Sequence, residues 1–151
     1  MKILIMGLPG SGKTTLAESL AHELDCDHFN ADKVREQFND WDFTAEGRLR
    51  QARRMRELAD KTDLAICDFV CPLPEMRDIF NADVVIWMDT IKEGRFKNTN
   101  QIFEEPEEYD LRFTSWNPGN LDIVLDYLGD DHGRKMDQRC DQAYAIPESI
   151  N

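Results

Sequence analysis

The chain is poor in cysteine, lacks long apolar runs and carries no excess of positive charge. Its 151 residues include four cysteines at irregular spacing, which argues against a disulfide framework and indicates reduced thiols in a cytoplasmic setting. No apolar run approaches the length of a membrane-spanning helix, so we expect no membrane partner. A net charge of −12 argues against broad binding to nucleic acid.

Two further absences narrow the range of functions. Cys67 and Cys71 stand four residues apart with no second pair of Cys or His nearby, so we expect them to pack rather than to bind zinc. Met1 leads directly into the apolar run that begins at Ile3, so we expect no signal peptide. The length and apolar content are those of one globular domain with an ordinary core.

The first fifteen residues carry the strongest pattern in the chain. An apolar run of strand length ends at Met6, and residues 7–14 follow it with the spacing G-x-x-x-x-G-K-T of a phosphate-binding loop. In such a loop, glycines let backbone N–H groups approach an anion, and a helix N-terminus adds its positive end. We predict that ATP and Mg²⁺ bind here, with Lys13 at the β- and γ-phosphates and the Thr14 hydroxyl on Mg²⁺. The predicted nucleotide contacts are Gly7, Pro9, Gly10, Ser11, Gly12, Lys13, Thr14 and Thr15.

Apolar periodicity predicts strands and helices that alternate along the chain. Strands are expected at 2–6, 27–29, 63–67, 83–88 and 111–115, and helices at 13–24, 31–38, 45–61, 72–80 and 120–128. This alternation predicts a three-layer α/β/α domain of the P-loop NTPase and nucleoside-monophosphate-kinase-like class, with a mostly parallel five-stranded sheet. We assign residues 1–128 to this domain, with a polar connection at 90–110. Residues 129–151 are expected to form a polar tail, packed on the domain or partly disordered.

Acidic residues follow several of the predicted strands. Ligands of a parallel sheet bind beyond the carboxyl ends of its strands, so these positions are candidates for chemistry. Asp68 is either a magnesium ligand or an ordinary strand-end cap, and Asp89 ranks below it. Asp32 and Arg35, three apart at the start of a helix, present either a base and an anion clamp or a helix-end acid with a surface arginine.

Five arginines crowd into nine residues of this acidic chain: Arg48, Arg50, Arg53, Arg54 and Arg56. This cluster predicts a site for a small anionic molecule rather than a nucleic-acid surface. The alternative is a solvated helix face with ion pairs four residues apart, such as Glu46–Arg50. We expect both, with Arg48 turned inward to the anion and Arg50 turned outward to Glu46.

Several of these elements, in order, resemble adenylylsulfate kinases. Residues 30–35 are similar to the D-G-D-x-x-R element of that family, and residues 43–54 to F-S-x-x-D-R-x-E-N-x-R-R. Residues 69–77 resemble F-I-S-P-x-x-x-x-R, and residues 84–90 the V-x-V-D-T strand. With the phosphate loop, the resemblance runs from residue 1 to about residue 90.

The resemblance implies a kinase that transfers the γ-phosphoryl group of ATP to the 3′-hydroxyl of adenylyl sulfate, with Mg²⁺. It implies that Arg35 and Arg48 hold the phosphosulfate and that Phe43 stacks on the acceptor adenine. The expected acceptor-binding residues are Asn30, Asp32, Arg35, Phe43, Arg48, Gln51 and Arg77. The expected catalytic residues are Lys13, Asp32 and Asp68, and the expected metal ligands are Thr14 and Asp68.

The chain departs from the family pattern at positions that concern the acceptor. Asn30 stands in place of an aspartate and cannot take a proton, so Asp32 or Asp68 would have to act as the base. Gly47 and Arg50 replace the two acids of the D-R-x-E-N element.

The sequence therefore leaves alternatives to an adenylyl sulfate kinase open. One alternative is a kinase of the same fold for another nucleoside, polynucleotide or small-metabolite hydroxyl. Another is a nucleotide-binding switch, although the N-K-x-D element that selects GTP is absent. A homodimer is compatible with each of these hypotheses.

Overall fold

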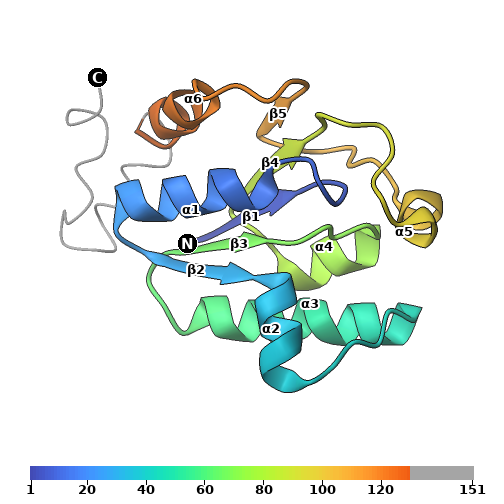
Figure 1. Ribbon diagram of the computed structural model, residues 1–151. Helices are drawn as coiled ribbons and strands as arrows, with labels where there is room; N and C mark the ends of the chain where they lie inside the picture. Colours follow the sequence, from blue (N-terminus) through green and yellow to red (C-terminus); the bar gives the residue numbers. More distant parts are fainter. Residues whose placement is uncertain (130–151) are drawn as a thin grey trace.

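The computed structural model describes residues 1–129, along which five strands and six helices alternate (Figure 1). The strands are β1 (Lys2–Met6), β2 (Asp27–Asn30), β3 (Ala65–Asp68), β4 (Val84–Met88) and β5 (Leu111–Phe113). The helices are α1 (Lys13–Leu24), α2 (Ala31–Phe38), α3 (Ala45–Asp60), α4 (Pro74–Phe80), α5 (Lys97–Ile102) and α6 (Asn120–Tyr127). The tail predicted at 129–151 lies, from residue 130 on, outside the described residues.

The five strands form one sheet in the order β2-β3-β1-β4-β5, and every neighbouring pair is parallel. The sequence predicted a mostly parallel sheet, and the described sheet is wholly parallel. All carboxyl ends therefore meet at one edge, where the register pairs Asn30 with Asp68. Because β1 lies between two strands that come later in the chain, the loop after it emerges at the centre of this edge (Figure 1).

Helices cover both faces of the sheet, as predicted. Side chains alternate between the faces along a strand. Ile3 and Ile5 of β1 accordingly pack in one apolar cluster with α1 and α6, whereas Leu4 and Met6 pack in a second cluster with α3 and α4 (Figure 1). The four side chains are fully buried. β1 is thus held from both sides, which gives the loop that follows it a rigid base.

Cys67 and Cys71 are packing residues, as the sequence indicated. Both are free and buried in the second cluster, and burial raises the pKa of the Cys71 thiol to about 12. A thiol with so high a pKa is a poor metal ligand. None of the helices within residues 1–129 is long and apolar enough to cross a membrane.

The connection at 90–110 contains a helix that the sequence analysis missed. α5 has no apolar period, and Thr99 is its one buried residue. Its position depends on Asn100, whose side chain accepts a hydrogen bond from Gly94 N (2.8 Å) and donates one to Gly94 O (2.9 Å). Gly94 lies against the phosphate loop, since a Cβ atom there would come 3.0 Å from Pro9 Cδ. The connection is therefore packed against the phosphate loop.

Candidate active site

The phosphate loop has the backbone conformation that its glycines predict. Gly7, Gly10 and Gly12 have φ values of 150°, 90° and 96°. A Cβ atom at Gly7 would clash with the carbonyl oxygen of Met88, and one at Gly12 would lie 2.9 Å from the Trp116 ring. Only glycine avoids both the strain and the contacts. The loop is therefore pinned between β4 and the segment that carries Trp116.

Ser11 supports the interpretation of this loop as an anion site. Its hydroxyl oxygen is buried and has no hydrogen-bond partner within residues 1–129. A buried polar group without a partner is rare and calls for an explanation. A phosphate oxygen or a bound water would supply the missing hydrogen bond, so the residues present fit a nucleotide phosphate.

Lys13 begins α1 and folds back into the loop. Its side-chain amine donates to the carbonyl oxygen of Leu8 at 3.1 Å, and the residue is only 8% exposed. Burial lowers the pKa of Lys13 to about 8, although the nearby carboxylates of Asp68 and Asp32 act in the opposite direction. Negative charge brought into the loop would favour the protonated amine.

A polar cluster joins the ends of β2 and β3 to the phosphate loop. Asp68 is buried, and its Oδ1 accepts hydrogen bonds from the Thr14 hydroxyl (3.0 Å) and from Asn30 Nδ2 (2.9 Å). Its Oδ2 is hydrogen-bonded to Nε2 of His28. The two predicted metal ligands, Thr14 and Asp68, therefore lie together.

The sequence analysis missed His28 in this cluster. It could have been found from the alternation of side chains along β2, which places His28 on the same face of the strand as Asn30. Within the described residues, no group of three or more His, Cys, Asp or Glu side chains could hold a metal alone. Thr14 and Asp68 offer two oxygens, so Mg²⁺ would need phosphate oxygens and water to complete its shell.

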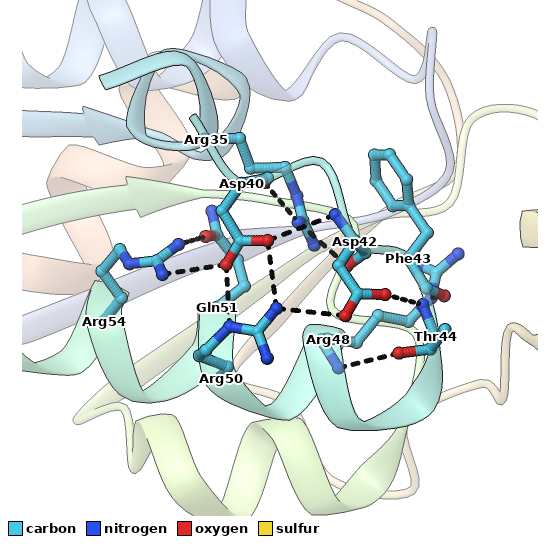
Figure 2. A network of polar contacts seen from close by, with 10 residues as sticks. Arg35, Asp40, Asp42, Phe43, Thr44, Arg48, Arg50, Gln51 and Arg54 are labelled. Atoms are coloured by element: carbon cyan, nitrogen blue, oxygen red, sulfur yellow. Dashed lines mark hydrogen bonds and ion pairs between the residues drawn. The ribbon is translucent and has the colours of Figure 1, made fainter. Parts of the chain in front are cut away.

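Arg35 and Arg48 form a second, positively charged part of the site, which we call the arginine clamp. They are 4% and 7% exposed, and their guanidinium carbons lie 4.3 and 5.3 Å from the centre of the half-exposed Phe43 ring. Arg35 donates to the carbonyl oxygens of Asp40 (2.9 Å) and Asp42 (3.2 Å), and Arg48 to that of Phe43 (2.9 Å) (Figure 2). Neither guanidinium is bonded to a carboxylate within residues 1–129. Burial lowers the pKa of both arginines.

Gln51 and Arg77, also predicted to bind the acceptor, are bonded to backbone carbonyl oxygens. Gln51 is buried and donates to Ala31 O at 3.0 Å, which ties α3 to the start of α2. Arg77 donates to the carbonyl oxygens of Cys71, Pro72 and Glu104. Their contact with an acceptor stays a prediction.

The predicted pairing of Arg50 with Glu46 is wrong. Arg50 is bonded to Asp40 (Nε to Oδ2, 2.8 Å) and to Asp42 (Nη2 to Oδ2, 3.1 Å), and Arg54 also reaches Asp40 (2.9 Å) (Figure 2). The loop that precedes α3 folds over the first turns of that helix, so its acids reach Arg50. Spacing along one helix cannot reveal such a partner.

A cavity of about 410 Å³ adjoins the phosphate loop. It is lined by Gly10, Ser11, Gly12, Thr15, Thr90, Ile91 and Trp116. The Trp116 ring is 48% exposed, and the Thr90 hydroxyl donates to Ser11 O at 2.8 Å. The sequence analysis could not locate a site for the base of a nucleotide, and this cavity is a candidate for it.

The buried charge of Lys13 leads to a prediction about stability and pH. The folded protein has a Lys13 pKa of about 8, below the ordinary 10.5 of the unfolded chain. Between these values the unfolded chain holds the extra proton, so the wild-type protein gains stability as pH rises. In nucleotide- and magnesium-free protein, Lys13→Met should raise the free energy of unfolding by about 1–3 kcal/mol at pH 7. That gain should shrink by pH 9.5.

Urea unfolding at the two pH values, with Lys33→Met on the exposed face of α2 as control, measures the effect. A Lys13→Met protein that is less stable than wild type at pH 7 would contradict this account of the buried amine.

Comparison of the sequence with known proteins finds matches over part of the chain. Residues 3–69 match a family model described as an AAA domain. A probable adenylyl-sulfate kinase of Aeropyrum pernix is 34% identical over 90 residues, which are 51% of this chain and 48% of the relative. A shikimate kinase of Legionella pneumophila is 29% identical over 115 residues, which are 69% of this chain and 66% of the relative. The chain thus spans half to two thirds of the length of these curated relatives.

The fold also matches solved structures. An adenylylsulfate (APS) kinase of Mycobacterium tuberculosis, solved in complex with AMPPNP and APS, superimposes with a TM-score of 0.72 at 22% identity. The match covers 84% of this chain and 96% of that one. At such identity the likeness concerns the fold. Together with the sequence match, it supports the resemblance stated above: the chain is similar to adenylylsulfate kinases and has the fold of the P-loop kinases.

Proposed function

We propose that the protein is an ATP- and Mg²⁺-dependent kinase that phosphorylates a hydroxyl group of an anionic acceptor bearing a planar ring. The best candidate for the acceptor is adenylyl sulfate, phosphorylated at its 3′-hydroxyl. One observation carries the proposal. Two buried arginines, which have no bonded carboxylate among residues 1–129, lie beside the exposed Phe43 ring, on elements that meet the phosphate loop at the same edge of the sheet. Such a surface suits a molecule with both an anionic group and a ring.

The ATP side of the site follows from the phosphate loop. The loop and Ser11 would hold the phosphates, and Lys13 would stabilise charge on the transferred group. The cavity beside Trp116 would receive the adenine, because an exposed indole ring offers a stacking surface. Mg²⁺, held through Thr14 and Asp68, would neutralise charge on the β- and γ-phosphate oxygens.

The two candidate carboxylates differ in their surroundings, which suggests different roles. Asp68 is buried and already accepts hydrogen bonds from Thr14 and Asn30. Asp32 is exposed, accepts no hydrogen bond within the described residues, and is near enough for its charge to oppose part of the lowering of the Lys13 pKa. We therefore assign Asp32 to receive the hydroxyl proton of the acceptor, and Asp68 to hold Thr14 and the metal. Phosphoryl transfer needs little help beyond alignment and charge stabilisation, so a single exposed carboxylate suffices.

A small carboxylate-bearing metabolite is the second candidate for the acceptor. The arginine clamp would bind a carboxylate by the same paired hydrogen bonds that hold a sulfate or phosphate. The matched relative that covers the larger share of this chain is a shikimate kinase. A nucleotide switch that transfers no phosphoryl group would leave the buried arginine pair without a role.

Release of ADP tests the proposal. The protein is incubated with ATP, Mg²⁺ and, in separate reactions, adenylyl sulfate, shikimate, a nucleoside or an oligonucleotide with a free 5′-hydroxyl. We expect adenylyl sulfate to stimulate ADP release and to gain a phosphate. Lys13→Ala should keep its fold by circular dichroism yet retain less than about a tenth of the rate. If shikimate alone stimulated ADP release, the acceptor would be the carboxylate-bearing metabolite. If none of the four compounds stimulated ADP release, the proposal would be rejected.

Arg48 and Arg53 lie on the same helix. Replacing each of them in turn distinguishes a direct contact with the acceptor from a general effect of removing positive charge. Arg48→Ala should raise the acceptor KM by about 10- to 100-fold, because it removes charge-assisted hydrogen bonds. The ATP KM should stay within about twofold, since the clamp does not line the nucleotide cavity. Arg53 is exposed, so Arg53→Ala should leave both values unchanged. Equal effects of the two substitutions on the acceptor KM would contradict the assignment of the clamp.

The roles of the two carboxylates can be separated by their magnesium dependence. Asp32→Asn should lower kcat by about 10²- to 10⁴-fold, as expected for loss of a base, without changing the Mg²⁺ concentration required. Asp68→Asn should raise the Mg²⁺ concentration that gives half-maximal rate, because one metal contact is lost. Steady-state rates across a magnesium titration measure both. If Asp32→Asn kept most of its activity while Asp68→Asn lost kcat at saturating Mg²⁺, the roles would be reversed.

A further inference from the structure

The arginine clamp depends on the loop between α2 and α3. We call residues 39–44 the acceptor loop. The backbone carbonyl oxygens of three of its residues, Asp40, Asp42 and Phe43, accept the hydrogen bonds of the two buried guanidinium groups. The same loop carries the Phe43 ring. The positions of Arg35, Arg48 and Phe43 relative to one another are therefore set by where this loop lies.

The acceptor loop is in turn held on α3 by its own two acids (Figure 2). Both carboxylate oxygens of Asp40 accept hydrogen bonds from Arg50, at 2.8 and 3.0 Å. Asp40 also accepts one from Arg54 at 2.9 Å. Asp42 receives Arg50 at 3.1 Å and the backbone N–H of Thr44 at 2.9 Å. The side chains of Asp40 and Arg54 are 13% and 14% exposed, so their ion pair is shielded from water. Arg50 and Arg54 hold the pKa of Asp40 well below its usual range.

Gly47 shows how closely the loop is seated. A Cβ atom at this position of α3 would lie 2.5 Å from Asp42 Cγ and 2.8 Å from Asp42 Cβ, and closer still to the Asp42 carbonyl oxygen. That oxygen is one of those that receive Arg35. Asp42 thus fills the space that any side chain at position 47 would need. A glycine inside a helix weakens the helix, and here its absence of a side chain lets the loop approach.

We propose that Asp40 and Asp42 are positioning residues for acceptor binding. By bonding Arg50 and Arg54 they fix the acceptor loop on α3, and the loop carbonyls then hold Arg35 and Arg48 beside Phe43. The proposal rests on the proposed function, in that the clamp is taken to bind the acceptor. The same two acids also neutralise Arg50 and Arg54, so Arg35 and Arg48 remain as the two buried arginines beside Phe43 that have no bonded carboxylate within residues 1–129.

The first measurement needs no acceptor. Amide hydrogen exchange of residues 40–48 is compared between wild type, Asp40→Asn and Asp42→Asn, each of which keeps its shape but loses the charge. The control is Asp60→Asn, because Asp60 pairs with Lys2 and Arg56 away from the site. We expect exchange in residues 40–48 to quicken by about tenfold in the two loop variants and to stay unchanged in the control. Arg50→Gln should reproduce the effect, and Asp40→Asn combined with it should add little.

The second measurement is binding of adenylyl sulfate by calorimetry, with a non-hydrolysable ATP analogue as the reference ligand. The two loop variants should bind adenylyl sulfate about tenfold more weakly than wild type, while their affinity for the ATP analogue stays within about twofold. Gly47→Ala should have the same pattern, because its methyl group displaces the carbonyl oxygen that receives Arg35. Alanine also favours the helical conformation more than glycine does, but that effect by itself would not weaken the binding of adenylyl sulfate.

The outcomes separate this inference from the proposed function. Unchanged exchange in the loop variants overturns the positioning role, whatever the protein binds. Faster exchange with unchanged adenylyl sulfate affinity also overturns it, because the clamp would then not depend on the loop. If wild type does not bind adenylyl sulfate but exchange quickens as expected, the named acceptor is wrong. The role of Asp40 and Asp42 in positioning the clamp would still be supported, because the exchange measurement contains no acceptor.

Discussion

The candidate site depends on positive charge that is buried and that, as far as the described residues show, is not bonded to a carboxylate. Lys13, Arg35 and Arg48 are each less than a tenth exposed, and the oxygens that receive them belong to the backbone. Taking a charged group out of water costs several kcal/mol, and a carbonyl dipole offsets only part of that cost. An anion that meets these groups would offset the remainder. Binding of an anion would thus recover part of the cost of burying these cations, which is how an acidic protein could present the anion site that we propose.

The wholly parallel sheet brings these cations together. Lys13 comes after β1, and Arg35 comes after β2, on α2. Arg48 lies on α3, which packs on the same face of the sheet as α2. Because every strand runs in one direction, the loops and helices that follow the strands gather at a single edge. The fit of Gly7 against the Met88 carbonyl group keeps the phosphate loop at that edge. Rigid strands below and glycine contacts above leave the loop little freedom to move.

Local patterns made most of the fold predictable, and they indicated which residues of the candidate site would lie together. The strand, loop and helix around Lys13 follow from spacing alone, and Thr14 and Asp68 were expected to meet because parallel strands end at one edge. α5 was missed because its residues lack an apolar period, and it is positioned by the side chain of Asn100 instead. The partners of Arg50 were wrong for a related reason: Asp40 and Asp42 reach it across a loop, and helix spacing considers only neighbours on the helix.

The pairing of Arg50 and Arg54 with acids of the acceptor loop also bears on how a ligand would approach. Their positive charge is cancelled within about 3 Å, so little of it extends into solvent, where salt screens charges beyond roughly 10 Å. The chain as a whole is negative, with a net charge of −12. Long-range attraction of an anion is therefore weak, and recognition takes place at contact. Capture by such a site would depend on fit and residence time rather than on electrostatic steering, and added salt would weaken the repulsion between the acidic chain and an approaching anion.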